Sequence, residues 1–166
     1  MPELPEVETV LRGISPILEG NKIEYAQVNR PDLRRPFPQN LAERLKNRKI
    51  NFLHRRSKYI LMDLSGGETL LIHLGMSGRI LISQEVQGAF HHNKAQSQKH
   101  DHFILHLKDS HQLTFNDPRR FGVIDLLETR SLETSASLAH IGPEPLSNSF
   151  NEAYFTDTIK TKKTNI

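Results

Sequence analysis

The sequence predicts a mostly β protein, a two-layer β-sandwich with an N-terminal α-helix and an incomplete C-terminal helical segment. Three observations support this. Apolar residues recur at helical spacing near the start of the chain. From residue 22 onward, short apolar stretches follow one another closely, and hairpin turns separate several of them. Roughly eight such strands at short spacing favour two packed layers over a single open sheet.

The first helix is expected over residues 5–19. Pro5 suits the first turn, where its missing N–H has no cost, and Glu6 and Glu8 favour the positive end of the helix dipole. The apolar positions of this helix are Val7, Val10, Leu11, Ile14 and Leu18.

The strands are expected over residues 22–29, 49–54, 59–64, 68–74, 79–83, 101–108, 112–116 and 121–128. In the first of them Ile23, Tyr25 and Val28 are the apolar residues. Residues 65–67 and 109–111 read as hairpin turns, and residues 31–38 as a loop. Asn40 is expected to cap a short helix that holds Leu41 and Leu45.

Two further segments complete the central part of the chain. The glycine-flanked residues 75–78 interrupt the strand at 68–74, which residues 79–83 are expected to resume. Residues 84–100 are polar and rich in Gln and His, and we expect a mobile loop there.

The end of the chain predicts a second domain. Residues 142–146 read as a linker, and Ser147 or Asn148 as the cap of a helix with apolar residues Phe150, Tyr154, Phe155 and Ile159. A lone amphipathic helix has little to pack against. We therefore expect a β-sandwich domain over residues 1–130, and over residues 131–166 a linker with the start of a truncated domain.

Composition suits a soluble globular protein of 166 residues, with 36% hydrophobic and 25% charged residues. The sequence has no apolar run long enough for a bilayer and no signal-peptide pattern, so a cytoplasmic location without a membrane partner is expected. Absence of cysteine excludes disulfides and thiolate zinc sites within the chain. We expect no metal at His91, His92, His100 and His102, because a loop offers no preset geometry.

Positive charge is concentrated in one part of the sequence. The net charge is +3 and the pI about 9.3, and the clustered cations are Arg30, Arg34, Arg35, Arg44, Lys46, Arg48, Lys49, Arg55, Arg56 and Lys58. Such a cluster either binds a polyanion, most simply nucleic acid, or forms a solvated basic face. Charge alone leaves both interpretations open.

The N-terminus carries a second candidate feature. Trimming of Met1 leaves Pro2 with a free secondary amine, which is a nucleophile able to form an iminium ion. Glu3 and Glu6 follow within one turn and suit general acid–base chemistry. The alternative interpretation is that Pro5 and Glu6 only begin a helix.

Five segments resemble the bacterial formamidopyrimidine-DNA glycosylases, a family that repairs oxidised purines in DNA. They are residues 1–9 (MPELPEVET), 55–59 (RRSKY), 72–78 (IHLGMSG), 99–102 (KHDH) and 116–122 (NDPRRFG), in the expected order. Together they span most of residues 1–146. Leu4 favours this branch over the related endonuclease VIII branch, which tends to have Gly there.

The resemblance implies base-excision repair by a bifunctional DNA glycosylase and AP lyase. Pro2 would attack the sugar C1′ of a flipped nucleotide, Glu3 would protonate the ring oxygen, and β- and δ-elimination would cut the strand. Glu6 would support the geometry at Pro2. Lys58 would bind the phosphate beside the lesion and help to keep the Pro2 amine uncharged.

The resemblance also implies DNA-binding residues. Lys58, His100 and Arg119 match phosphate-binding positions. Met76, Arg119 and Phe121 would fill the hole left by the flipped nucleotide, with Arg119 facing the orphan cytosine. The alternative for Met76 and Phe121 is burial in the core, and His73 is given a minor role.

Intact members of the family continue with a helix–two-turn–helix domain and a four-cysteine zinc finger, neither of which is complete here. We therefore expect a monomer that binds damaged double-stranded DNA weakly, shows little activity alone and holds no cofactor. The alternative function is a non-catalytic DNA-binding fragment, and an interaction module ranks third.

Overall fold

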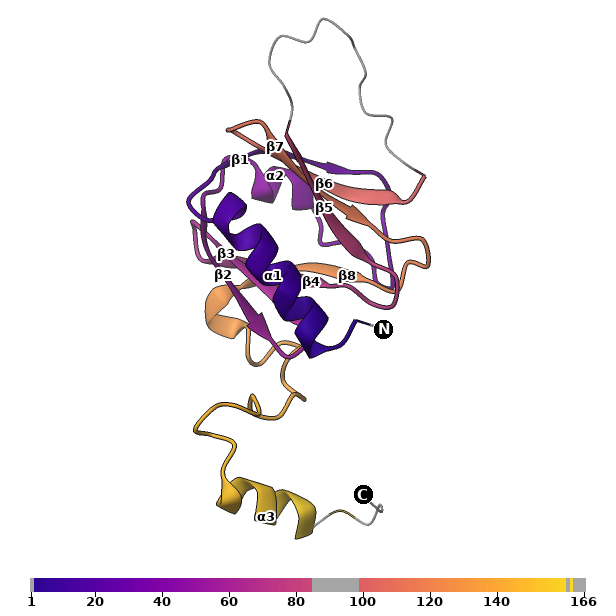
Figure 1. The fold of residues 1–166 in the computed structure, drawn as a ribbon. Helices are drawn as coiled ribbons and strands as arrows, with labels where there is room; N and C mark the ends of the chain where they lie inside the picture. Colours follow the sequence, from indigo (N-terminus) through magenta and orange to yellow (C-terminus); the bar gives the residue numbers. More distant parts are fainter. Residues whose placement is uncertain (1, 85–98, 161, 163–166) are drawn as a thin grey trace, which may run out of the picture.

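The computed structural model describes residues 2–84, 99–160 and 162 of the chain. Two four-stranded antiparallel sheets face each other, which confirms the predicted sandwich (Figure 1). One sheet has the order β1-β6-β7-β5 and the other the order β2-β3-β4-β8. The strands are β1 (Ile23–Val28), β2 (Ile50–Arg56), β3 (Tyr59–Leu64), β4 (Glu68–His73), β5 (Arg79–Gln84), β6 (Asp101–Leu107), β7 (His111–Asn116) and β8 (Val123–Glu128).

Helix α1 (Leu4–Leu18) forms where the apolar periodicity predicts it and packs against β2 and β3. Its buried residues lie at spacings of three and four along one face: Val7, Leu11, Ile14 and Leu18. Pro5 lies in the first turn, as expected. Burial of this face against the sheet fixes the position of the helix N-terminus, and with it the start of the chain.

The main core lies between the two sheets and under α1. Phe103 and Phe115 are among its largest fully buried side chains. A smaller core lies on the other face of the β2-β3-β4-β8 sheet, where Leu132 and Leu138 cover Leu61 and Leu71. The segment that follows β8 and the short 3-10 helix η1 (Thr129–Ser131) therefore covers this sheet from outside, through Leu132 and Leu138.

The loops after β4 and β7 both carry the chain from one sheet to the other. The expectation that residues 79–83 resume the preceding strand is wrong, because β4 and β5 belong to different sheets. Arg79 at the start of β5 pairs with Asn116 at the end of β7, and His73 at the end of β4 pairs with Val123 at the start of β8. The loops 74–78 and 117–122 consequently lie together at one end of the sandwich.

Two other elements differ from expectation in detail. A β-bulge between Ile23 and Tyr25 changes the face of β1, so Tyr25 is exposed and stacks on His106 rather than entering the core. Asn40 does precede α2 (Leu41–Leu45), but it has a left-handed backbone and its side chain makes no capping hydrogen bond.

Helix α3 (Glu152–Lys160) begins later than predicted. Asn151, and neither Ser147 nor Asn148, is its cap, because the Asn151 side chain accepts the Tyr154 N–H at 3.0 Å. Ser147 instead donates to the Glu144 carbonyl within the preceding turn. The exposed side chains of this part of the chain include Leu146, Phe150, Tyr154, Phe155 and Ile159. The loop expected at 84–100 lies mostly outside the described residues.

Candidate functional site

The start of the chain is held in place by hydrogen bonds at the N-terminus of α1. The backbone N–H of Glu3 donates to Oε2 of Glu6 at 3.0 Å, and the Glu3 carbonyl accepts the Val7 N–H at 3.1 Å. Glu6 therefore caps the helix, in addition to lying at the positive end of its dipole as the helix-start interpretation expected. The same bond fixes the backbone next to Pro2, so the two interpretations of the N-terminus are compatible.

Lys58 approaches this N-terminus from the turn between β2 and β3. Its Nζ lies 3.3 Å from Oε2 of Glu3. Ser57 before it has a left-handed backbone (φ 51°), which closes the turn. The structure thus brings Glu3, Glu6 and Lys58 together, with Pro2 next to Glu3 in the chain, although 55 positions separate Glu3 from Lys58.

The two arginines before Lys58 belong to an internal ion-pair network. Arg55 contacts Glu8 of α1 at 2.8 Å and Glu144 at 3.0 Å, and Arg56 contacts Glu144 at 3.2 Å. The backbone N–H of Ser57 also donates to Glu144. Arg55 therefore connects α1 and Glu144 to the β2–β3 turn, and Arg56 pairs with Glu144 as well. Neither arginine belongs to a free basic face.

The pKa values of the network follow from these contacts. Hydrogen bonds from Arg55 and then Arg12 lower the pKa of Glu8. Burial opposes ionisation of Glu144, but the Ser57 N–H and the Arg55 guanidinium outweigh it and lower the Glu144 pKa. Sequence reasoning missed Glu8 and Glu144 as partners, because nothing in their spacing links them to Arg55.

The loops 74–78 and 117–122 expose the residues expected to enter DNA. Met76 and Phe121 are 44% and 41% exposed, so the alternative of burial in the core is wrong for both. The Arg119 guanidinium lies over the Phe121 ring, 4.9 Å from its centroid. A flexible apolar side chain, an aromatic ring and a planar cation therefore stand together at the surface.

Asp117 joins the two loops and is fully buried. Its carboxylate accepts hydrogen bonds from the Ser77 hydroxyl and, at 2.8 Å, from the Gly122 N–H. The Ser77 oxygen in turn accepts the Arg119 N–H at 3.1 Å. Sequence reasoning missed Asp117 and Ser77, since a polar loop gives no sign that its aspartate will be enclosed.

Gly75 allows the loops to meet. Its φ is +63°, and a Cβ there would lie 2.4 Å from the Phe121 carbonyl carbon. The neighbouring His73 accepts the Gly75 N–H through Nδ1 at 3.0 Å. Burial, and then the charges of Lys58 and Arg34, lower the pKa of His73, so its ring is neutral near pH 7 and able to accept. This contact is structural.

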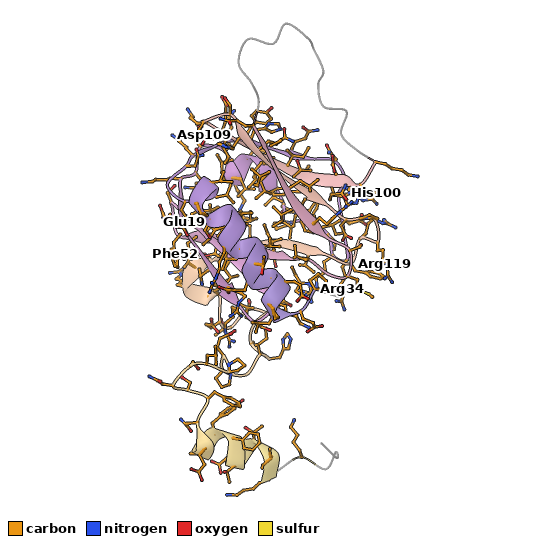
Figure 2. The ribbon with its side chains drawn as sticks, in the orientation of Figure 1. Glu19, Arg34, Phe52, His100, Asp109 and Arg119 are labelled. Atoms are coloured by element: carbon orange, nitrogen blue, oxygen red, sulfur yellow. The ribbon has the colours of Figure 1, made fainter. Side chains whose placement is uncertain are left out.

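His100 lies beside the same loops, just before β6. Its carbonyl accepts the Asp117 N–H at 2.9 Å, while the His102 ring contacts the Asp117 carbonyl at 2.8 Å. Figure 2 shows His100, Arg119 and Arg34 on one side of the molecule. In Figure 1 the N-terminus lies on this side as well. His100, Arg119 and Arg34 therefore lie on the same side of the molecule as the N-terminus.

Comparison with known proteins identifies the family. Residues 1–124 match the family described as formamidopyrimidine-DNA glycosylase N-terminal domain. The chain belongs to the formamidopyrimidine-DNA glycosylase family. It is 54% identical over 162 residues to the formamidopyrimidine-DNA glycosylase of Roseobacter denitrificans, and 56% identical over 163 residues to that of Jannaschia sp.. These alignments cover 98% of this chain and only 57% and 58% of the two relatives.

Solved structures of this family support the same conclusion. The Lactococcus lactis formamidopyrimidine-DNA glycosylase bound non-covalently to DNA with an AP site matches with a TM-score of 0.84 and 29% identity. The match covers 99% of this chain and 60% of that protein. The same enzyme in complex with Fapy-dG-containing DNA matches with a TM-score of 0.81 and 29% identity, covering 96% and 57% of the two chains.

The four-cysteine zinc finger that the resemblance implies for intact members of the glycosylase family does not fit the residues of this chain. The sequence has no cysteine. Over residues 2–84, 99–160 and 162, no three His, Asp or Glu side chains gather closely enough to hold a metal ion. His91 and His92 lie outside this described part. Within it, no helix is long and apolar enough to cross a membrane.

Proposed function

We propose that this chain is the catalytic half of a bifunctional DNA glycosylase and AP lyase that excises oxidised purines such as 8-oxoguanine and formamidopyrimidines. The observation that carries the proposal is the cluster at the N-terminus of α1. There Glu3 lies 3.3 Å from Lys58 and its backbone is fixed by Glu6. These contacts support the assignment of Pro2 as nucleophile, Glu3 as acid and Lys58 as neighbouring cation.

The first step needs only the residues of this cluster. After removal of Met1, the Pro2 nitrogen uses its lone pair to attack C1′, and the bond from C1′ to the base breaks with its electrons leaving on the base. The amine loses its proton as the new bond forms, and the departing base takes up one proton, so the charges balance. Glu3 protonates the sugar ring oxygen as the ring opens, which leaves an iminium ion between Pro2 and C1′.

The strand is then cut by elimination from this iminium. It acidifies the C2′ protons, so loss of one expels the 3′ phosphate (β-elimination), and a further proton loss expels the 5′ phosphate (δ-elimination). Hydrolysis releases the amine of Pro2. We assign to Lys58 the phosphate beside the damaged nucleotide, where its charge also favours the uncharged form of the Pro2 amine.

The loops at the end of the sandwich serve the extrusion of the nucleotide. Reaching C1′ in a duplex requires the nucleotide to leave the stack. We assign Met76, Arg119 and Phe121 to the resulting gap, with Arg119 facing the widowed cytosine and His100 contacting the backbone. Their exposure and the stacking of Arg119 on Phe121 support this assignment.

We also propose that residues 1–130 form the catalytic domain, and that residues 131–166 comprise the linker and the first helix of a helix–two-turn–helix domain. Glu144 nevertheless contacts the sandwich through Arg55 and Arg56. Because the matched relatives extend well beyond this chain, we expect weak DNA affinity and low activity from these 166 residues alone.

Borohydride trapping tests the proposal. The chain, with Pro2 confirmed as its first residue, is incubated with a duplex that carries an abasic site and is then reduced. A covalent protein–DNA adduct is expected, and Pro2→Gly, which replaces the secondary amine, should reduce it strongly. Arg130→Ala provides a matched surface control. DNA binding without any adduct would favour the alternative of a non-catalytic DNA-binding fragment.

A further inference from the structure

Arg34 is an exposed cation beside the loop at 117–122, although no motif of the sequence singled it out. It lies in the loop after β1. Leu33 on one side is buried, and Phe37 on the other packs against the core near Phe103. The loop is closed by the Phe37 N–H, which donates to the Pro31 carbonyl at 2.9 Å. Arg34 is thereby held on a fixed loop with its side chain outside.

The backbone of Arg34 is attached to the exposed loop that carries Phe121. Its N–H donates to the Gly122 carbonyl at 3.3 Å. Gly75 packs against the same Phe121–Gly122 backbone. Three loops, at 31–38, 74–78 and 117–122, thus meet at one point, and Arg34 belongs to the first of them.

Arg34 is also close enough to His73 for its charge to act on that ring, as Lys58 does. His73 therefore lies within reach of two cations, one from the N-terminal cluster and one from the loop at 31–38. The two differ in their partners. Lys58 pairs with Glu3, whereas in the part of the chain that the structure describes the Arg34 guanidinium has no carboxylate partner.

We infer that Arg34 is a phosphate-binding residue that bridges the N-terminal cluster and the residues Met76, Arg119 and Phe121. A guanidinium that is exposed, unpaired and held on a fixed loop suits bidentate binding of a phosphate. Arg34 is attached to the loop that carries Phe121, and its charge reaches His73 as that of Lys58 does. DNA that contacts both Lys58 and Phe121 therefore lies within reach of Arg34. The inference rests on the proposed function, since it requires DNA on this face.

The salt dependence of DNA binding tests the inference. The probe is a duplex with a tetrahydrofuran abasic analogue opposite cytosine. Its affinity is measured by fluorescence anisotropy at KCl concentrations between about 50 and 200 mM. Loss of one phosphate contact lowers the slope of log K against log salt by about 0.9 and the affinity at 0.1 M salt by about eightfold. We expect both changes for Arg34→Ala and recovery of the slope for Arg34→Lys.

Arg130→Ala is the matched control, because it removes the same charge at the opposite end of β8. Arg130 is 84% exposed and pairs with Glu128. Strand β8 lies between Arg130 and the 117–122 loop, and its length places Arg130 about 20 Å from that loop. Its slope should equal that of the unmodified chain, and the unfolding midpoints of Arg34→Ala and the unmodified chain should agree.

The outcomes separate the two proposals. Absence of DNA binding by the unmodified chain would refute the proposed function together with this inference. Binding by the unmodified chain, with Arg34→Ala at the same slope or with equal losses for Arg34→Ala and Arg130→Ala, would overturn the role of Arg34 alone. If Arg34 acts only through its charge on His73, the slope of Arg34→Ala should equal that of the unmodified chain.

Discussion

Nζ of Lys58 lies 3.3 Å from Oε2 of Glu3, so the turn between β2 and β3 is joined to the N-cap residue of α1. Glu3 is the more exposed partner of this ion pair. A DNA phosphate that binds Lys58 would compete with the Glu3 carboxylate for the ammonium. Phosphate binding would then release the acid that the proposed chemistry needs.

Glu3→Gln tests the acid role directly, because it removes the proton donor while it preserves the size of the side chain. We expect the rate of borohydride-trapped adduct formation to fall by about 10²-fold or more. DNA affinity should hold or rise, since the substitution adds one positive charge to the net balance. An unchanged trapping rate at saturating DNA would contradict the assignment of Glu3.

Met76→Ala and Phe121→Ala distinguish residues that insert into DNA from core residues. Both side chains are more than 40% exposed, so we expect the free energy of unfolding to change by no more than about 0.5 to 1 kcal/mol. Affinity for the abasic duplex should fall for both. Phe115→Ala is the matched core variant and should cost about 3 to 5 kcal/mol of stability.

Denaturant unfolding and anisotropy titration on the same samples give the two readouts. Loss of stability in Met76→Ala or Phe121→Ala as large as in Phe115→Ala would show that these residues are structural. Unchanged DNA affinity in both exposed-residue variants would contradict their insertion.

The neutral state of His73 predicts a specific pH dependence. Its pKa is lowered in the folded chain, so the unfolded chain binds the proton first as the pH falls below about 6.5. The stability that neutral His73 contributes is therefore complete above this pH and is lost as the pH falls through the folded pKa. Each pH unit in this window costs at most about 1.4 kcal/mol.

Denaturant unfolding at several pH values between 7 and 5 checks this window. His73→Gln is the reference, since Gln cannot titrate and offers an oxygen to the Gly75 N–H. The unmodified chain should lose stability relative to this variant as the pH is lowered. Parallel stability curves for the two proteins would refute the role of His73.

Arg55 and Arg12 form a matched pair for testing the ion-pair network, because each lies 2.8 Å from Glu8. The Arg55 side chain is 16% exposed and that of Arg12 is 79% exposed. Arg55→Met should lower the free energy of unfolding by about 2 to 3 kcal/mol, because it leaves Glu8 and Glu144 without their shared cation. Arg12→Met should change it by less than about 1 kcal/mol.

The network also predicts acid sensitivity. Because the pKa values of Glu8 and Glu144 are lowered, their contribution to stability is complete above about pH 4.5 and is lost as the pH falls below it. This loss should be smaller in Arg55→Met than in Arg12→Met. Equal acid dependence in the two variants would show that Arg55 does not hold these carboxylates.

The elements of the fold could be predicted because their signals are local. The apolar spacing of Val7, Leu11, Ile14 and Leu18 defines α1, and short apolar runs define the strands. The assignment of strands to sheets could not be predicted from such patterns. A glycine-flanked loop after His73 is compatible both with an interrupted strand and with the observed crossing to the other sheet.

The candidate site likewise contains residues that could be predicted from the sequence and residues that could not. Its motif residues Pro2, Glu3 and Lys58 are visible in the sequence because the resemblance marks them. The residues that hold the site in place, such as Asp117 and Glu144, could not be found. Their roles depend on burial and on partners distant in the sequence, which for Glu144 and Arg55 are 89 positions apart.

The position of the covalent bond tests the central claim most directly. After borohydride reduction the adduct is digested with protease and nuclease, and tandem mass spectrometry locates the sugar remnant on the peptide. The account predicts that the remnant is attached to the nitrogen of Pro2 in the N-terminal peptide. A remnant on Lys58 or on any other lysine would contradict it, because the amine of the chain terminus would then not be the nucleophile.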